Sequence, residues 1–354
     1  MKKAILGIVG FLIILILIFL LQSAPIDPAA YAPPRAPELS GVLAPNALLQ
    51  KAELLAQGKI NGPEEVAVDS QGRVYGGTQD GQIMRLWPDG KLEVFSETKG
   101  RPLGLQFDKQ ENLIVCDSYK GLLSIDPQGK IKILATSAEG GPFKFTDALD
   151  IASDGTIYFT DASSKYKQDE YLYDLLESKP HGRFLNYDPV TGQVKVLLKD
   201  LYFANGVALS QQEDFVLVNE TYRYRIVRYW LKGPKAGTHE IFIDNLPGFP
   251  DNISSNRKGT FWLALFTVRN EMMDKLHPFA FLKAQMSKLP QAFWPKPKPY
   301  GFVLALDENR KITQSLHEPT GQYLKEITSA REYGGYLYLG SLHNDRIGKY
   351  KLGG

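Results

Sequence analysis

The sequence has 354 residues, 44% of them hydrophobic, so it is long enough to bury a large core. Its 41 basic and 39 acidic residues give a formal net charge of +2, which excludes the strongly basic surface typical of nucleic-acid-binding proteins. The single cysteine, Cys116, excludes an internal disulfide framework, and its apolar neighbours in LIVCD indicate a buried structural thiol.

The N-terminal segment has the character of a membrane anchor. Lys2 and Lys3 precede an uncharged apolar run over residues 4–21, about the minimum length that spans a bilayer. The run is long for a signal peptide, and no A-x-A cleavage motif follows it, so we expect an uncleaved signal anchor, with a cleaved signal peptide as the alternative. The two lysines should stay in the cytoplasm, which places the rest of the chain on the extracytoplasmic side, in the periplasm or a lumen.

This pattern divides the chain into three parts. Residues 1–24 are the expected membrane anchor. Residues 25–46, which include PIDPAAYAPPRAPELSG, are rich in proline and alanine and favour extended backbone, so we expect a stiff tether. Residues 47–354 form the expected folded body.

The folded body repeats one short unit. An apolar run is followed by Asp or a turn, then Gly, then a second apolar run, as in GPEEVAVDSQGRVYGG and FTDALDIASDGTIYFTD. Six copies with strand-type composition predict an all-β fold, a six-bladed β-propeller behind a single N-terminal transmembrane anchor. The last copy has only three strand-like runs, so we expect a strand between about Ala47 and Ile60 to complete it. The copies begin at Gly62, Arg101, Phe145, Phe203, Gly248 and Tyr323.

Two longer gaps between copies predict insertions. The first lies between Lys165 and Arg183, and the second between Asn270 and Pro299. In the second, apolar residues recur at helical spacing, which predicts an amphipathic helix bounded by prolines. We expect this helix to cap the opening of the tunnel, with packing on the blade edges as the alternative, and its lysines also suit anionic head groups. These lysines are Lys275, Lys283 and Lys288.

The first residues of each copy open the innermost strand and should face the tunnel. In four copies these residues are acids or amides, and the same region of the sixth copy offers Glu326 or Glu332. Carboxylate and amide oxygens that converge on one axis are the ligands that Ca²⁺ prefers, whereas Mg²⁺ takes fewer of them together with water. The cysteine and histidines lack zinc-site spacing. The tunnel candidates are Glu64, Glu65, Asp147, Asn205, Asp251 and Asn252.

Several motifs together give the chain a family resemblance over residues 47–352. The sequence resembles the strictosidine synthase-like proteins, within the wider group of paraoxonases, gluconolactonases and diisopropylfluorophosphatase. The motifs are GPEEVAVD, RPLGLQFD, FTDALDI with YFTDASS, GRFLNYDPVTG, FANGVALS, GFPDNIS and LPQAFWPKPKPYG.

The resemblance implies a six-bladed propeller with one calcium ion in the tunnel. Its metal ligands would be Glu64, Asp147, Asn205 and Asp251, and Asn252 matches a further amide position. The chain departs from the family pattern at two positions. Asp147 stands where Asn is usual, which adds a negative charge that should tighten the metal and weaken its Lewis acidity. Leu103 stands where paraoxonases have a candidate histidine base.

We therefore expect a calcium-dependent hydrolase of small hydrophobic lactones, aryl esters or related esters. In it Asp251, or a metal-activated water, would attack the substrate, and Glu65 would be a candidate base. Glu332 matches the catalytic glutamate of plant strictosidine synthase, although a solvated turn residue is the simpler interpretation. The alternative is a non-catalytic, calcium-stabilised propeller that binds a ligand or a protein. A strictosidine synthase-type condensation enzyme is the third interpretation.

Overall fold

The computed structural model describes residues 2–353, and its strands form six four-stranded antiparallel sheets and one two-stranded sheet. The first three sheets follow the order of the chain. They consist of β2 (Val66–Val68), β3 (Val74–Gly77), β4 (Gln82–Leu86) and β5 (Leu92–Glu97); β6 (Pro102–Phe107), β7 (Leu113–Asp117), β8 (Gly121–Ile125) and β9 (Ile131–Ala135); and β12 (Thr146–Ile151), β13 (Ile157–Asp161), β14 (Gly182–Tyr187) and β15 (Val194–Leu201).

The remaining sheets include one that joins the two ends of the folded body. They consist of β16 (Ala204–Leu209), β17 (Phe215–Glu220), β18 (Arg225–Trp230) and β19 (His239–Ile243); β20 (Gly248–Ser255), β21 (Thr260–Val268), β22 (Gly301–Asp307) and β23 (Ile312–Glu318); β1 (Glu53–Leu55), β26 (Ile347–Lys351), β25 (Tyr336–Ser341) and β24 (Ile327–Tyr333); and the small pair β10 (Ser137–Ala138) and β11 (Gly141–Pro142).

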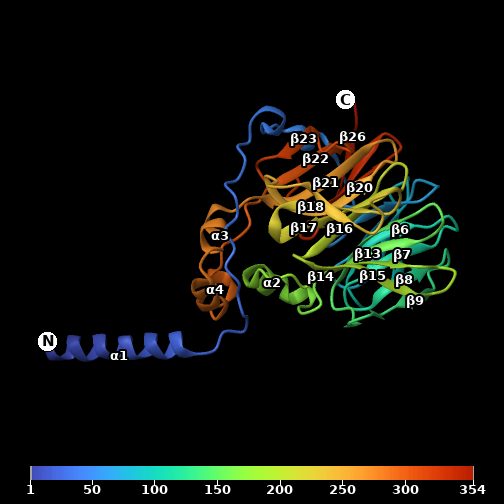
Figure 1. Cartoon of the computed structure of the whole chain (residues 1–354). Helices are drawn as coiled ribbons and strands as arrows, with labels where there is room; N and C mark the ends of the chain where they lie inside the picture. Colours follow the sequence, from blue (N-terminus) through green and yellow to red (C-terminus); the bar gives the residue numbers. More distant parts are fainter. Residues whose placement is uncertain (1, 354) are drawn as a thin grey trace.

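The innermost strands of the six sheets contact one another in a closed cycle. β2 contacts β6, β6 contacts β12, and the series continues through β16, β20 and β24 back to β2. This arrangement is a six-bladed β-propeller, as predicted (Figure 1). The ring closes through β1, which pairs with β26 with Glu53 opposite Lys349 and Leu55 opposite Ile347. The predicted closing strand from the segment before Ile60 is therefore confirmed.

The strands show why the sequence builds blades rather than one open sheet. Inner and second strands such as β7 (LIVCD) and β17 (FVLVNE) are buried along their whole length, because each blade is covered on both faces by its neighbours. Outer strands such as β5 and β9 are partly exposed. Apolar side chains of adjacent blades fill the space between their sheets, as in the cluster that joins Phe215 and Phe242 to Phe261 and Phe302.

Two insertions form helices on one side of the ring (Figure 1). The first contains the 3₁₀ turn η3 (Gln168–Glu170) and α2 (Tyr171–Glu177). The second contains α3 (Glu271–Leu276), α4 (Ala280–Ser287) and the 3₁₀ turn η5 (Gln291–Phe293). The prediction of one amphipathic helix here is wrong: the segment forms two short helices, separated at Pro278, whose ring cannot continue the α3 hydrogen bonds.

The N-terminal region consists of a long helix and an ordered extended segment. The helix α1 (Lys2–Leu21) has a mean hydropathy of 3.4 and contains no buried residue, and its last turn contacts Lys288 through Phe19 and Leu20. Residues 25–46 then run along α4 and α3 to the rim of the propeller, where η1 (Gly41–Leu43) and η2 (Leu48–Lys51) lead into β1 (Figure 1). This segment, which we call the strap, is not a free spacer, because its backbone is hydrogen-bonded to the folded body.

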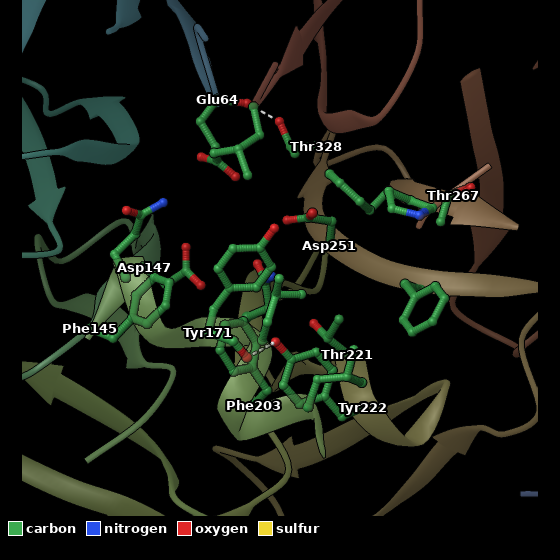
Figure 2. A pocket seen from close by; sticks show the side chains of 18 of the residues that line it. Glu64, Phe145, Asp147, Tyr171, Phe203, Thr221, Tyr222, Asp251, Thr267 and Thr328 are labelled. Carbon is green, nitrogen blue, oxygen red and sulfur yellow. Dashed lines mark hydrogen bonds between the residues drawn. The ribbon is translucent and has the colours of Figure 1, made fainter. Parts of the chain in front are cut away.

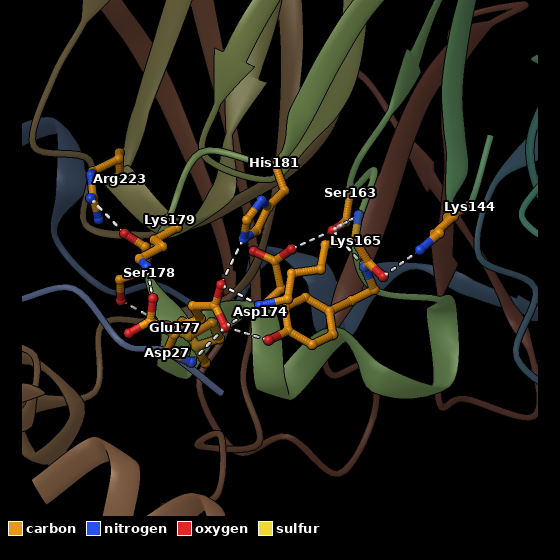
Figure 3. Close-up of polar contacts among 12 residues, drawn as sticks. Asp27, Lys144, Ser163, Lys165, Asp174, Glu177, Ser178, Lys179, His181 and Arg223 are labelled. Carbon is orange, nitrogen blue, oxygen red and sulfur yellow. Dashed lines mark hydrogen bonds and ion pairs between the residues drawn. The ribbon is translucent and has the colours of Figure 1, made fainter. Parts of the chain in front are cut away.

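The strap is held mainly by α2 and its surroundings. The backbone amide of Asp27 donates to the Glu177 carboxylate at 3.0 Å, and the amide of Ala29 donates to the Glu177 carbonyl at 2.9 Å. Glu177 also accepts hydrogen bonds from Lys165 at 2.7 Å and from the hydroxyl of Tyr166, and its carboxylate lies 2.9 Å from His181 Nε2 (Figure 3). These partners hold the pKa of the buried Glu177 carboxyl at about 2 against the opposing effect of burial.

Candidate functional site

The predicted ligands Glu64, Asp147, Asn205 and Asp251 line one pocket at the centre of the ring. Figure 2 shows the carboxylates of Glu64, Asp147 and Asp251 around a common space. The pocket wall is mostly apolar, and part of it is aromatic. Its rings include Phe145, Tyr171, Phe203, Tyr222, Phe249 and Phe266.

Irregular pairing at the start of the inner strands aims these side chains into the pocket. The register between β12 and β13 shifts after Thr146, that between β16 and β17 shifts after Ala204, and that between β20 and β21 shifts after Pro250. Each shift lies directly before a candidate ligand. A bulge breaks the alternation of the strand and re-aims a side chain, so these irregularities turn Asp147, Asn205 and Asp251 toward the axis.

Neighbouring blades hold the backbone of the ligand residues in place. Thr160 Oγ1 donates to the Asn205 carbonyl at 2.8 Å, Thr328 Oγ1 donates to the Glu64 carbonyl at 2.6 Å, and the Asn219 amide donates to the Asp251 carbonyl. The blades approach closely because of glycine. A Cβ on Gly206 would lie 2.6 Å from the Asp251 carbonyl oxygen, closer than side chains tolerate.

These supporting residues were missed from the sequence, although a repeated signal was present. In three successive blades the second strand ends with an acidic residue. The carboxylate of this residue accepts a hydrogen bond from a backbone amide just before the inner strand of the same blade. Asp117 accepts from the amide of Arg101 at 3.0 Å, Asp161 from that of Phe145 at 2.8 Å, and Glu220 from that of Tyr202 at 2.8 Å. The side chain of the residue before each acid donates a hydrogen bond to a backbone carbonyl of the neighbouring blade; these residues are Cys116, Thr160 and Asn219.

The negative charges of the three buried pocket carboxylates repel one another when these groups are ionised. Burial raises the pKa of Glu64 well above its usual range, and the charges of Asp251 and Asp147 raise it further. Burial and the charge of Asp251 likewise raise the pKa of Asp147 well above its usual range. Burial raises the pKa of Asp251 to about 8, although the Asn205 side chain and the Asn252 amide partly oppose this. A cation among these groups would remove the repulsion.

The polar atoms in the pocket fit a hard cation. Glu64 Oε2, Asn205 Oδ1 and Asn252 Oδ1 are buried and have no hydrogen-bond partner. All three are oxygen donors of the kind that Ca²⁺ and Mg²⁺ take. Across residues 2–353, no three acidic, histidine or cysteine side chains lie close enough to hold a metal by themselves. A cation would therefore depend on the amide oxygens and would draw the carboxylates together.

Two of the predicted catalytic residues lie away from this pocket. The Glu65 carboxylate accepts a hydrogen bond from Arg331 at 2.7 Å and another from the amide of Leu105 at 3.0 Å. Glu332 accepts from Trp262 Nε1 at 2.8 Å and from Asn256 at 3.0 Å. Both carboxylates are committed to other partners and do not line the pocket, so the structure does not support their use as catalytic groups.

The residues around the pocket opening include a histidine. His343 follows the pocket residue Leu342, and its Nδ1 lies 2.7 Å from a carboxylate oxygen of Glu326. Its ring packs edge-on against Phe266, which lines the pocket. Leu103, by contrast, is buried in the apolar wall with Phe145 and Phe203. His343 itself is exposed and does not line the pocket.

The second insertion forms part of the pocket wall. Asn270, Met273, Pro295 and Pro297 all contribute to the lining, together with Tyr171 and Leu175 of the first insertion. The two ends of the insertion therefore reach the pocket, whereas α4 contributes no lining residue, so the capping of the tunnel opening by a helix stays a prediction. The pocket has an enclosed floor of acids and amides under apolar walls, an arrangement that suits a small, mostly apolar molecule with one polar group directed at the floor.

Comparison with known proteins places this site in a family. The family model for strictosidine synthase matches residues 147–234, and the model for the N-terminal part of strictosidine synthase-like proteins matches residues 41–86. The adipocyte plasma membrane-associated protein of Rattus norvegicus is 38% identical, with 94% of each chain covered. Protein STRICTOSIDINE SYNTHASE-LIKE 10 of Arabidopsis thaliana is 35% identical over 88% of this chain and 93% of its own. The chain belongs to the strictosidine synthase-like family.

Solved structures share the propeller at low sequence identity. A gluconolactonase from Xanthomonas campestris superposes with a TM-score of 0.62 and 19% identity, covering 94% of this chain and 98% of its own. The calcium-binding protein regucalcin from Agrobacterium tumefaciens gives 0.61 and 13%, covering 84% and 93%. These likenesses show that the chain shares its propeller fold with the two proteins. The apolar helix α1 and the membrane-associated relatives support a membrane location.

Proposed function

We propose that this protein is a membrane-anchored, calcium-dependent hydrolase of hydrophobic lactones, aryl esters or related esters. The observation that carries the proposal is the pocket floor, where three buried carboxylates and partnerless amide oxygens lie below a mostly apolar wall. The proposed ligands are Glu64, Asp147, Asn205 and Asp251, with Asn252 at the edge of the set. Asn252 donates to Glu64 at 2.8 Å, which fixes the orientation of that carboxylate and leaves the Asn252 oxygen free.

The proposed chemistry uses the position of Asp251. When bound, calcium would polarise the carbonyl oxygen of the ester. Asp251 would then either attack the carbonyl carbon or take a proton from an attacking water. Either role needs an ionised carboxylate, whereas burial raises the pKa of Asp251 to about 8. A neighbouring cation lowers the pKa of a carboxyl group, so bound calcium would favour the ionised form of Asp251 that either role requires.

The wall of the pocket supports a preference for apolar substrates. Phe145, Phe203 and Phe249 surround the acidic floor, and Met273 and Leu175 close the pocket from the insertions. A sugar lactone would leave its hydroxyl groups without partners against these side chains, which costs free energy for each unpaired group. An acyl or aryl chain would bury against them. We therefore propose hydrophobic lactones and esters rather than sugar lactones as the substrate class.

The second candidate function is a non-catalytic propeller that binds an apolar ligand and is stabilised by calcium. Leu103 favours it, because this position carries no proton-accepting group and is buried in the apolar wall. A condensation reaction of the strictosidine synthase type has less support, because Glu332 is occupied by Trp262 and Asn256 outside the pocket.

Hydrolysis assays separate these functions. The full chain in detergent micelles is assayed against a long-chain acyl lactone, an aryl ester and a sugar lactone, with EDTA and after restoration of Ca²⁺. The proposal predicts hydrolysis of the first two, loss with EDTA, recovery with Ca²⁺, and abolition in Asp251→Ala, while the matched control Glu332→Ala keeps its rate. Calcium binding without hydrolysis of any substrate would favour the non-catalytic propeller. An equal loss in both variants would revive the condensation-type site.

A further inference from the structure

The second insertion carries an unusual density of exposed apolar side chains. Elsewhere on the propeller such residues occur singly, for example Val94, Ile133 and Val190. In the insertion they come from α3, from the turn before α4, from α4 and from η5, and Phe293 is 73% exposed. An exposed apolar cluster of this kind marks an interaction surface. We call it the cap patch; it consists of Met272, Phe279, Phe281, Leu282, Leu289 and Phe293.

The cap patch stands on a firmly held platform, so its exposure is not the result of a loose segment. Asp274 accepts hydrogen bonds from the hydroxyl of Tyr224 at 2.9 Å and from Arg269 at 3.0 Å. Lys283 is fully buried and donates to the carbonyl of Ala29 at 2.6 Å and to Ser178 at 2.9 Å. The expectation that Lys283 suits lipid head groups is therefore wrong, because its ammonium group bonds the strap to the cap.

The end of the membrane anchor lies against the same insertion. The ammonium group of Lys288, just after α4, donates to the carbonyl of Phe19 at 3.0 Å and to that of Leu20 at 3.3 Å. It also lies 5.3 Å from the centre of the Phe19 ring. Figure 1 shows α3 and α4 on the side of the propeller from which α1 emerges. Because a spanning helix ends at the lipid surface, this contact brings α4 to that surface.

The polar residues beside the cap patch suit the same environment. Lys296 and Lys298 are exposed directly after η5, where they can meet phosphate groups while Phe293 enters the acyl region. Two adjacent residues of α3 point in different directions, one to the surface and one to the pocket. Met272 is 64% exposed, whereas Met273 is buried and lines the pocket. One thin layer of protein thus separates the pocket from the face that carries the patch.

We propose that the cap patch inserts into the surface of the bilayer that α1 spans. Two attachments, the helix and the patch, then fix the orientation of the propeller and hold the pocket wall that the insertion forms beside the membrane. A lipid surface is the occupant favoured by these observations, because the anchor holds the patch beside it and the flanking lysines match its head groups. The proposal does not depend on catalysis, since it concerns only where the cap lies.

Site-directed spin labelling tests this orientation in the full chain. Cys116 is fully buried, so a nitroxide reagent will react selectively with a cysteine introduced at the surface. Labels are placed at Phe281→Cys and Phe293→Cys, with Val190→Cys, which is 90% exposed between β14 and β15, as the matched control. The protein is reconstituted in phosphatidylcholine vesicles with a minor fraction of phosphatidylserine. Collision rates with oxygen, which concentrates in lipid, and with a water-soluble nickel chelate are then measured.

The proposal predicts an oxygen-to-nickel collision ratio several-fold higher at positions 281 and 293 than at 190. Equal ratios at all three positions would overturn it, because the patch would then face water. Low collision rates with both reagents at 281 and 293 would also overturn it, since they would indicate a face covered by a second copy of the chain. If either labelled variant fails to fold, the collision ratio of a label at Met272→Cys on α3 is compared with that at position 190 and interpreted in the same way.

Discussion

At the level of single residues, the buried acids of the pocket floor lower the free energy of unfolding when no cation balances their charge. Glu64, Asp147 and Asp251 are all buried, and each has a raised pKa with burial as the largest cause. Buried like charges are retained in proteins mainly where they bind something of opposite charge or perform chemistry. The carboxylate at position 147, where the family usually has Asn, therefore adds to the repulsion among these groups.

Replacement of Asp147 by Asn should change these two properties in opposite directions. In EDTA the variant should be more stable to unfolding, by on the order of 1 kcal/mol, because a buried charge without a partner is removed. Its affinity for Ca²⁺ should fall, because one anionic ligand becomes neutral. Urea unfolding and calcium titration check the two effects. A variant that is less stable in EDTA would contradict the repulsion among these side chains.

The candidate ligands could be predicted from sequence because the repeats can be aligned with one another. An acid or amide at the same place in several copies must meet its equivalents at the axis. The same reasoning failed for Glu65, because successive side chains of an extended backbone point in opposite directions: Glu64 faces the pocket, and Glu65 turns to Arg331. It also failed to find Thr160 and Asn219, whose bonds cross to a neighbouring blade.

At the scale of elements, the strap and the two insertions form one unit over the pocket. Ile26 of the strap packs with Leu176 of α2, Met273 of α3 and Trp294 after η5. His277 follows α3 and is fully buried; its Nδ1 lies 3.2 Å from the Ser178 hydroxyl, and its Nε2 has no partner. Composition revealed the helix-forming insertion, but the docking of a proline-rich segment depends on individual hydrogen bonds that no periodicity encodes.

His277 should make this unit sensitive to mild acid. Burial, followed by the charges of Lys283, Arg223 and Arg269, lowers the pKa of His277 to about 3. Below an unfolded pKa near 6.5, the unfolded chain binds a proton that the folded chain excludes, so stability falls as the pH falls from 6.5 toward 3. At pH 5 the loss should be about 2 kcal/mol.

Urea unfolding of the wild type and of His277→Gln at pH 7 and pH 5 tests this effect. The variant should lose less stability on acidification than the wild type. The matched control is His239→Gln on the exposed strand β19, which should behave as the wild type does. His317, whose pKa burial lowers to about 4, acts in the same direction, so the variant should retain part of the acid sensitivity. Identical acid sensitivity of wild type and His277→Gln would contradict the account of this buried ring.

At the scale of the whole molecule, the ring is closed by residues that precede its first blade. Leu49 of η2 is fully buried in the cluster that joins the fifth and sixth blades, where it accompanies Trp262 and Leu337. The sequence predicted this closure because the last repeat lacked a strand. It did not indicate that a 3₁₀ turn would also pack into the core, because four residues are too few to show a period.

Truncation of Leu49 should loosen the closure of the ring. Leu49→Ala removes a fully buried side chain and should cost about 2–5 kcal/mol of unfolding free energy. The exposed control Val190→Ala should change it by less than about 0.5 kcal/mol. Urea unfolding of both variants in the full chain measures the difference. A cost for Leu49→Ala as small as that of the control would show that this contact does not hold the ring closed.

The central claim is that the axis of the propeller binds calcium through acids and amides of separate blades. Isothermal titration of the full chain with Ca²⁺, in wild type and in Asp251→Ala, tests it most directly. We expect one bound ion per chain in the wild type and loss of that binding in Asp251→Ala, while Glu332→Ala should bind as the wild type does. Absence of binding in the wild type, or unchanged binding in Asp251→Ala, would contradict it.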